Sequence, residues 1–158
     1  MTYEELLIEA DENGLITKEK DLLANKGRIK GDRIAIKRDI PTLAEKSCVL
    51  AEELGHYYTT TGCILDQNSS ENRKQELKAR MWAYDKQIGL SGIIDAFENK
   101  CETLHDMAEY LDVTEEFLIE TLEAYTSKYG LSKKVGNYTI LKESIIVRAV
   151  KKEQLYKM

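Results

Sequence analysis

The sequence has few cysteines and no long apolar run. Three cysteines (Cys48, Cys63 and Cys101) are an odd number, which argues against a disulfide framework. No apolar stretch reaches the roughly 18 residues that a membrane span needs. The opening residues, Met1–Glu5, are acidic and lack the apolar core of a signal peptide. We therefore expect a cytoplasmic protein, with no membrane segment and with reduced cysteines.

Positive charge is also limited, because 23 Lys and Arg residues face 28 Asp and Glu residues, for a net charge of −5. A general phosphate-binding surface is therefore not expected, although a local basic patch is compatible with these numbers. Hydrophobic residues make up 42% of the 158 residues, enough for one modest core. This length suits one domain, or one domain with a small helical annex.

The first forty residues carry both helix and strand signals. Thr2 opens a capping box, and Asn13-Gly14 ends the helix that follows. A second short helix is expected to begin near Thr17. After Gly31-Asp32, apolar and polar residues alternate, so we expect a hairpin whose second strand is Ile34–Arg38.

Helical periodicity dominates the middle of the chain, and the tail differs from it. The expected helices are Thr42 to Tyr58, Ser70 to Gln87, a short one around Ile93 after a break at Gly89 and Gly92, Leu104–Leu111, and a long one between Thr114 and Gly130. Residues 135–150 are expected to form a small hairpin, or one strand and a closing helix. The composition of elements predicts a mostly helical α+β fold.

The segment around Glu52, Glu53 and His56 suggests a metal site. Glu52 and His56 are four residues apart, so a helix places both side chains on one face, where they can reach one metal ion. Glu53 is rotated by about 100° and can approach a water beside that ion. In H-E-x-x-H zinc peptidases the glutamate is the general base. This chain reads E-E-x-x-H, and a carboxylate ligand in the first position would lower the Lewis acidity of the metal.

A catalytic zinc needs a third protein ligand, for which Glu76 is the candidate. Glu76, Ala79 and Ala83 stand on one helical face, and the alanines would let this helix approach the metal helix closely. We expect Glu76 to be buried there. The alternative is that E-E-x-x-H is a solvated helical face, as such strings usually are.

Several neighbouring residues have a structural alternative to a functional role. Cys48 is either a sulfur ligand or a small packed residue, and Cys63 is an alternative ligand that would approach the site from a loop. His105 is expected to be a surface or capping residue. Either Tyr57 or Tyr58 could hydrogen-bond a reacting carbonyl oxygen, although a packed aromatic ring is the more frequent arrangement.

Together, Leu50–Tyr58 and Arg73–Ala83 resemble the ImmA/IrrE family of metallo-endopeptidases. The likeness extends from the predicted Ile34–Arg38 strand to about Gly130. It implies one Zn²⁺ ion held by His56 and Glu76, with Glu53 as the base and Glu52 in place of the family's first histidine. The resemblance also implies a phage or mobile-element protein that cleaves a helix-turn-helix repressor and so derepresses genes.

The resemblance implies a zincin-like core at 1–90 with a small β-sheet or hairpin. A helical annex is expected at 91–130, and a C-terminal β or closing segment packed on the core at 131–158. We further expect the Ile34–Arg38 strand to be a sheet edge that holds an extended substrate.

Two alternatives to the peptidase remain open. One is a non-catalytic relative that acts only as a binding partner. The other is a DNA-binding regulator, because the segment Leu104–Leu118 also resembles a helix-turn-helix. The outward residues of its second helix are acidic (Glu115, Glu116, Glu120 and Glu123). They would face phosphate with the wrong sign, so nucleic acid is not the expected partner.

Overall fold

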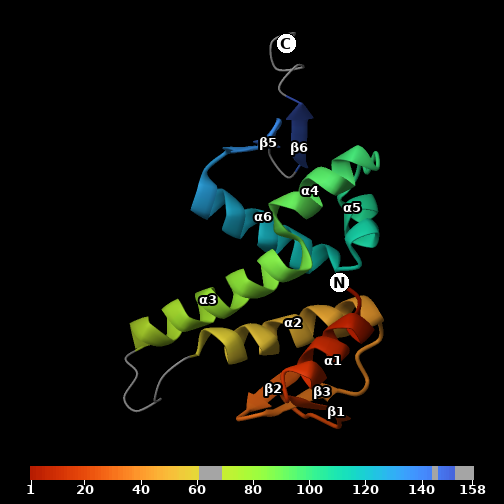
Figure 1. The fold of residues 1–158 in the computed structure, drawn as a ribbon, viewed down its shortest axis with the longest axis vertical. Coiled ribbons are helices and arrows are strands. Elements are labelled where there is room, and N and C mark those ends of the chain that lie inside the picture. Colours follow the sequence, from red (N-terminus) through yellow and green to blue (C-terminus); the bar gives the residue numbers. More distant parts are fainter. Residues whose placement is uncertain (61–68, 144–145, 152–158) are drawn as a thin grey trace. The chain divides into compact units, whose positions relative to one another are not determined.

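The computed structural model describes residues 1–60, 69–143 and 146–151 (Figure 1). Contacts group the chain into two compact units, Met1–Gln87 and Ile88–Met158. The described part of the first unit contains α1 (Tyr3–Glu12), β1 (Ile16–Lys20), β2 (Gly27–Lys30), β3 (Arg33–Lys37), α2 (Leu43–Thr59) and α3 (Ser69–Gln87). The second contains α4 (Gly89–Glu98), α5 (Leu104–Leu111), α6 (Glu115–Tyr129), β4 (Ser132–Val135), β5 (Tyr138–Glu143) and β6 (Ile146–Lys151). The mostly helical α+β class is as predicted. The finer division into 1–90, 91–130 and 131–158 stays a prediction.

Local capping signals begin the helices where the sequence predicts. Thr2 and Glu5 form the expected capping box, with the Glu5 carboxylate accepting from the Thr2 N–H at 2.8 Å. The hydroxyl of Thr42 accepts a 3.1 Å hydrogen bond from the Glu45 N–H at the start of α2. The Thr114 hydroxyl does the same for the Phe117 N–H of α6. Each cap satisfies a backbone N–H that has no partner within the helix.

The first unit contains a three-stranded sheet in the order β1-β3-β2. The predicted hairpin is confirmed as β2 and β3, joined through Gly31 in the left-handed region at φ 61°. The helix predicted near Thr17 is wrong, because these residues form β1, which pairs in parallel with β3. Alternate burial along β1, with Thr17 and Glu19 more buried than their neighbours, shows that pairing with β3 overrides the helical propensity of the local sequence.

The sheet order also corrects the expected substrate edge. The Ile34–Arg38 segment is central rather than at the edge, because β1 pairs with one side of β3 and β2 with the other. Its backbone groups are therefore engaged on both sides, and it has no free edge for an added strand. The open edges of the sheet belong to β1 and β2.

The core of the first unit lies between the sheet and two helices. Leu6 of α1, Leu50 and Leu54 of α2, and Ile34 and Ile36 of β3 are fully buried. Figure 1 shows α1 and α2 on the same side of the sheet, and both helices contact its strands. Each such side chain contributes about 1.5–3 kcal/mol through burial. This packing fixes the orientation of α2, which carries the candidate site residues.

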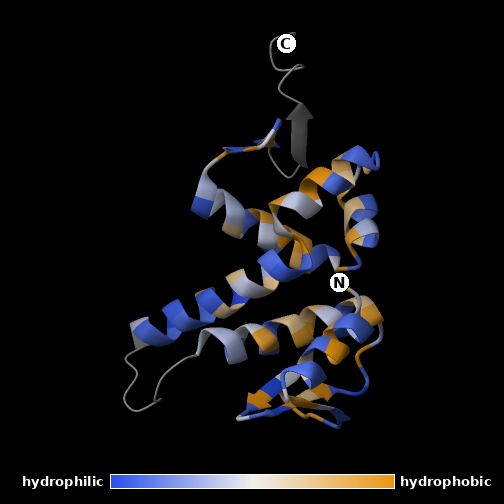
Figure 2. Ribbon diagram, in the orientation of Figure 1, coloured by the Kyte–Doolittle hydropathy of each residue, from blue (hydrophilic) through white to orange (hydrophobic). Residues whose placement is uncertain are grey.

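Helix α3 packs against α2 through small residues. Most of α3 is hydrophilic (Figure 2), but Ala79 and Ala83 are completely buried, as the alanine face predicts. A Cβ placed on Gly55 of α2 would collide with the carbonyl oxygen of Ala79 and lie 3.0 Å from its carbonyl carbon. The two backbones are thus in direct contact at Gly55 and Ala79, and this crossing determines how near Glu76 lies to His56.

The second unit combines three helices with a second sheet. Gly89, at φ 62°, breaks the chain after α3 as expected, but Gly92 lies inside α4 rather than at a break. The hairpin alternative for residues 135–150 is confirmed, because β5 and β6 pair antiparallel there, and β4 adds a third strand that was not predicted. The Tyr138 hydroxyl donates to the Glu98 carboxylate and links β5 to α4. Residues 152–158, part of the predicted closing segment, lie outside the described residues.

No helix in the described ranges is long and apolar enough to cross a membrane.

Candidate metal centre

Two of the predicted metal ligands meet across the α2–α3 crossing. The Nε2 atom of His56 lies 3.4 Å from Oε2 of Glu76. The other carboxylate oxygen of Glu76 accepts a 3.2 Å hydrogen bond from Nε of Arg80, one helical turn later. Arg80 thus holds one oxygen of Glu76, and the second oxygen faces the imidazole.

The separation of these two donor atoms suits a shared metal ion. Zinc lies about 2.0–2.1 Å from histidine nitrogen and carboxylate oxygen, so two donors of a tetrahedral site are about 3.4 Å apart. The His56–Glu76 distance of 3.4 Å matches this value and exceeds the usual N–H···O distance of about 2.7–3.2 Å. The pair therefore fits two corners of a zinc site.

The predicted third ligand, Glu52, does not form a metal-binding group with His56 and Glu76 in the structure. Glu52 lies one turn before His56 on α2 and is half-buried. Within residues 1–60, 69–143 and 146–151, however, no three His, Cys, Asp or Glu side chains form a metal-binding group. Cys63, the alternative ligand from the loop, lies outside the described residues. Cys48 is buried in α2, as a packed residue would be.

The site is more open than the sequence suggests. The Glu76 side chain is 46% exposed, so the expectation of a buried ligand is wrong. The reason is that Ala79 and Ala83 occupy the buried face of α3, while Glu76 lies nearer the start of the helix, where neighbouring residues are exposed. The His56 side chain is 31% exposed, which leaves this pair accessible to water and to a substrate.

Glu53 lies against the edge strand β2. Its carboxylate accepts a hydrogen bond from the backbone N–H of Ile29. A Cβ on Gly27 would lie only 2.7 Å from Oε1 of Glu53, so a glycine is needed for the carboxylate to approach this backbone. Arg28 pairs with Ala35 of β3, and in antiparallel pairing the residues on either side direct their backbone groups outward. This alternation leaves the Ile29 N–H free for Glu53.

The environment of Glu53 suits a proton acceptor at neutral pH. Burial raises the pKa of Glu53 from 4.5 to about 7, with smaller contributions from the negative charges of Glu52 and Glu76. The hydrogen bond from Ile29 opposes this shift. A base works best when its pKa is near the working pH, so the position of Glu53 fits general base catalysis.

The tyrosines after His56 contact other aromatic rings, and the Tyr57 side chain is exposed. Tyr58 stacks on Trp82 with a ring-centroid distance of 5.0 Å and an interplanar angle of 29°. Tyr57 contacts Tyr58 edge-on at 5.1 Å. The contacts match the packed-aromatic alternative and give no support to an oxyanion role for Tyr58.

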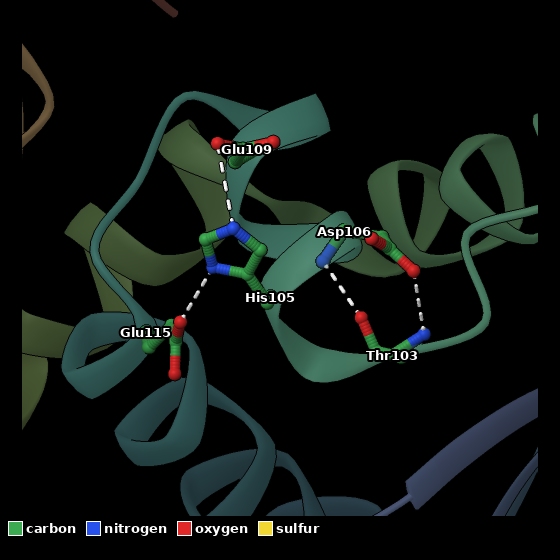
Figure 3. Close-up of polar contacts among 5 residues, drawn as sticks. All are labelled: Thr103, His105, Asp106, Glu109 and Glu115. Atoms are coloured by element: carbon green, nitrogen blue, oxygen red, sulfur yellow. Dashed lines mark hydrogen bonds and ion pairs between the residues drawn. The ribbon is translucent and has the colours of Figure 1, made fainter.

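The His105 side chain is exposed, as predicted, and Figure 3 shows its polar contacts. Its Nδ1 is 2.8 Å from Oε1 of Glu115, and its Nε2 is 3.5 Å from Oε1 of Glu109. The two glutamates come from different helices, so His105 links α5 to α6. Thr103 and Asp106 form the capping box that begins α5. The contacts of His105 are those of a surface ion pair.

The pKa of His105 is expected to lie above its ordinary value of 6.5. The hydrogen bond that the imidazole donates to the Glu115 carboxylate is the main cause, followed by the charge of Glu109. Any stabilisation from the pair is present below pH 6.5 and is lost as the pH rises through the folded-state pKa. An NMR titration of the imidazole measures this value. Glu115→Gln should lower it, and Glu116→Gln, a change at an exposed neighbour, should lower it less. Equal effects would contradict the pairing.

The second unit contains the helix pair that resembles a helix-turn-helix. α5 and α6 are joined by a short turn with Asp112 in the left-handed region at φ 54°. The first turn of α6 exposes Glu115 and Glu116. Negative charge stabilises a helix N-terminus but repels phosphate. The DNA-binding alternative therefore gains no support from this surface.

Three contributors to the site were not identified from the sequence. Arg80 stands four residues after Glu76, a spacing at which helical side chains pair, so a sequence signal existed. Gly27 and Ile29 carry no such signal, because their role depends on β2 lying beside α2.

Comparison with known families agrees with these features. The model of the Peptidase_M78 family, described as the IrrE N-terminal-like domain, matches residues 11–123. No curated protein and no solved structure matches the chain. The match covers most of the chain and includes α2 and α3, which carry the predicted E-E-x-x-H segment and Glu76. The chain therefore belongs to the Peptidase_M78 family, whose domain is IrrE N-terminal-like.

Proposed function

We propose that this chain is a zinc-dependent endopeptidase whose substrate is a helix-turn-helix repressor. The observation that carries the proposal is the 3.4 Å approach of His56 and Glu76, two zinc-type donors from separate helices. Family membership supports a peptidase-like activity on a protein. The repressor as substrate, and a phage or mobile-element origin, rest on the resemblance to ImmA/IrrE peptidases.

In this proposal His56 and Glu76 bind the ion, and Glu52 supplies the third donor. Glu52 lies one turn from His56 on α2, within reach of the same ion through its flexible side chain. A bound zinc ion supplies Lewis acidity, which polarises a scissile carbonyl and lowers the pKa of water. Arg80 orients Glu76 by holding the oxygen that does not face His56.

Glu53 performs the proton transfers. Its ionised carboxylate, held by the Ile29 N–H, takes a proton from the attacking water and then delivers it to the leaving amine. The half-exposed side chains of His56 and Glu76 leave the substrate side open. Two carboxylate ligands donate more charge than one, so we expect weaker activity than with two histidines.

A non-catalytic relative is the second candidate. One observation favours it: the described residues do not assemble a three-ligand metal group. In that case the chain would bind its partner protein without cleaving it. Metal content and cleavage distinguish the two candidates.

Zinc stoichiometry is the first test. We expect about one Zn²⁺ per chain after metal loading and dialysis, and we expect His56→Ala and Glu76→Ala to lose it. His105→Ala is the matched control, since His105 is the only other histidine, and it should retain the metal. Equal zinc in all four proteins, or no zinc in any of them, would exclude the proposed site.

Cleavage is the second test. A helix-turn-helix repressor of the kind that the resemblance implies is co-expressed with this chain, and fragments are detected by mass spectrometry. We expect Glu53→Gln to reduce cleavage by about 10²- to 10⁴-fold while zinc stays bound, because only the base is lost. Binding of the intact repressor with no cleavage by the wild-type protein would instead favour the non-catalytic relative.

A further inference from the structure

The sheet of the first unit has one face that is strongly basic. Side chains alternate along each strand, so β1 directs Lys18 and Lys20 to the exposed face, while Glu19 between them pairs inward with Lys46 at 2.8 Å. On β2, Arg28 and Lys30 are likewise exposed on both sides of Ile29. Arg33 of β3 adds a fifth cation. This basic face contrasts with the net charge of −5 of the whole chain.

These cations surround a groove. The five basic residues line a hollow of about 440 Å³, and none of the described residues that line it is acidic. This volume lies within the range of about 300–1,000 Å³ for ligand sites. Arg33 lies 4.0 Å from Asp32, but Lys18, Lys20, Arg28 and Lys30 form no ion pair with any other described residue. Most of the positive charge in the groove is thus available to a ligand.

The shape of the groove follows from strand pairing. Ala35 of β3 lies between Lys18 of β1 and Arg28 of β2 in the register of the sheet. The Ala35 side chain is short, so the face is hollow along β3. The cations of β1 and β2 lie on either side of this hollow, about 10 Å apart. Cations two residues apart on one strand are spaced by about 6.6 Å. Alternate side chains of an extended peptide have the same spacing.

The lining also has apolar members. The apolar residues that line the groove are Ile16, Leu22, Ile34 and Ala35. Ile16 is 46% exposed. Among the described residues, no aromatic side chain lines the groove. Binding of single-stranded nucleic acid generally uses aromatic rings on which bases stack. An apolar floor with cationic walls suits a peptide that carries both acidic and apolar side chains.

We propose that this face of the sheet binds an extended acidic segment of a partner protein. The segment lies along β3, and its acidic side chains, which occupy alternate positions and so share one face of the extended chain, reach the cations of β1 and β2. Opposite charges on the two surfaces provide specificity and speed association. This binding requires neither the metal nor cleavage, so it holds or fails independently of the proposed peptidase activity.

Fluorescence anisotropy with a labelled peptide, Glu-Ala-Glu-Val-Glu-Ala-Glu, tests the proposal on the full chain in EDTA. We expect saturable binding that is at least about tenfold tighter than binding of the same peptide with Lys in place of Glu. Affinity should fall between 50 and 300 mM salt, because exposed charges are screened. The triple variant Lys18→Gln, Lys20→Gln, Lys30→Gln should lose at least about tenfold in affinity.

A matched triple variant controls for net charge. Lys74→Gln, Lys78→Gln, Lys134→Gln removes the same charge from exposed positions elsewhere and should bind like the wild type. Amide NMR shifts of the wild-type protein, which need no variant, should concentrate in residues 16–20 and 27–37. Absence of binding, equal losses in both triple variants, or shifts elsewhere would overturn the proposal. Equal or tighter binding of a dT20 oligonucleotide would also overturn it, in favour of a phosphate-binding surface.

Discussion

Gly55→Ala is expected to lower the free energy of unfolding by about 2–3 kcal/mol and to abolish zinc binding. The added methyl group would collide with the backbone carbonyl of Ala79 at the α2–α3 crossing. Neither backbone can rotate away, since both positions lie inside helices, so the helices must separate by about 1 Å to restore ordinary contact distances. That separation outweighs the gain of about 1 kcal/mol that alanine brings to a helix interior.

The same displacement would separate the two donor atoms. His56 follows Gly55 directly, and Glu76 lies three residues before Ala79, so both side chains move with the crossing. Their 3.4 Å approach would lengthen beyond the spacing of a shared ion. This variant therefore links the stability of the helix pair to the metal site.

Urea unfolding followed by far-UV circular dichroism and by the fluorescence of Trp82, the only tryptophan, measures the effect. Gly92→Ala in α4 is the control, because its Cβ would meet side-chain atoms rather than backbone: the flexible end of Leu111 at 3.2 Å and Cγ2 of Ile88 at 3.7 Å. We expect that change to alter stability by less than about 1 kcal/mol. The close contact between α2 and α3 would be refuted if Gly55→Ala and Gly92→Ala had the same free energy of unfolding, or if the Gly55→Ala protein still bound zinc.

Glu53→Gln is expected to stabilise the metal-free protein by about 2–3 kcal/mol at pH 8 and to change its stability little at pH 5. Burial keeps the pKa of Glu53 near 7, whereas an unfolded chain releases the proton near 4.5. The folded state therefore binds more protons than the unfolded state between these values. Stability from this group falls as the pH rises from about 4.5 to 7 and is constant above that range.

Glutamine has the shape of a protonated glutamate and carries no charge at any pH. The difference in unfolding free energy between the wild type and Glu53→Gln therefore measures the effect of ionising Glu53. Unfolding in urea with EDTA present, at pH 5, 6, 7 and 8, should show a difference that grows with pH. Glu12→Gln, an exposed glutamate at the end of α1, is the control and should show no such trend. A constant difference across the series would mean that Glu53 is not held in an unfavourable ionised state.

The stability prediction and the cleavage prediction for Glu53→Gln together mean that Glu53 lowers the stability of the metal-free protein and serves in catalysis. The same substitution that stabilises the metal-free chain should remove the cleavage activity. Such a trade-off is expected where a buried ionisable group serves a reaction. It also separates Glu53 from Glu12, whose removal affects neither property.

Short-range signals in the sequence predicted the helices well. The caps at Thr2, Thr42 and Thr114 depend on hydrogen bonds within three residues, so they are present in any structure that begins a helix there. The hairpin through Gly31 is equally local, because two residues determine its turn. These predictions are confirmed because no distant contact competes with them.

Predictions that depended on distant partners were wrong. Thr17 lies in a strand because β1 pairs with β3, which no local pattern reveals. The Ile34–Arg38 strand is central because a third strand covers its other side. Strand pairing connects residues far apart in sequence, and local propensity is a weak guide to it.

For the candidate site, the sequence by itself determined the spacing of Glu52 and His56 and the alanine face of α3, because both follow from 3.6 residues per helical turn. Only the tertiary structure decided the distance between His56 and Glu76, the partial exposure of Glu76 and the raised pKa of Glu53. These properties depend on how closely two helices and an edge strand pack. A side chain's distance, exposure and pKa are set by neighbours that the chain brings together only when it folds.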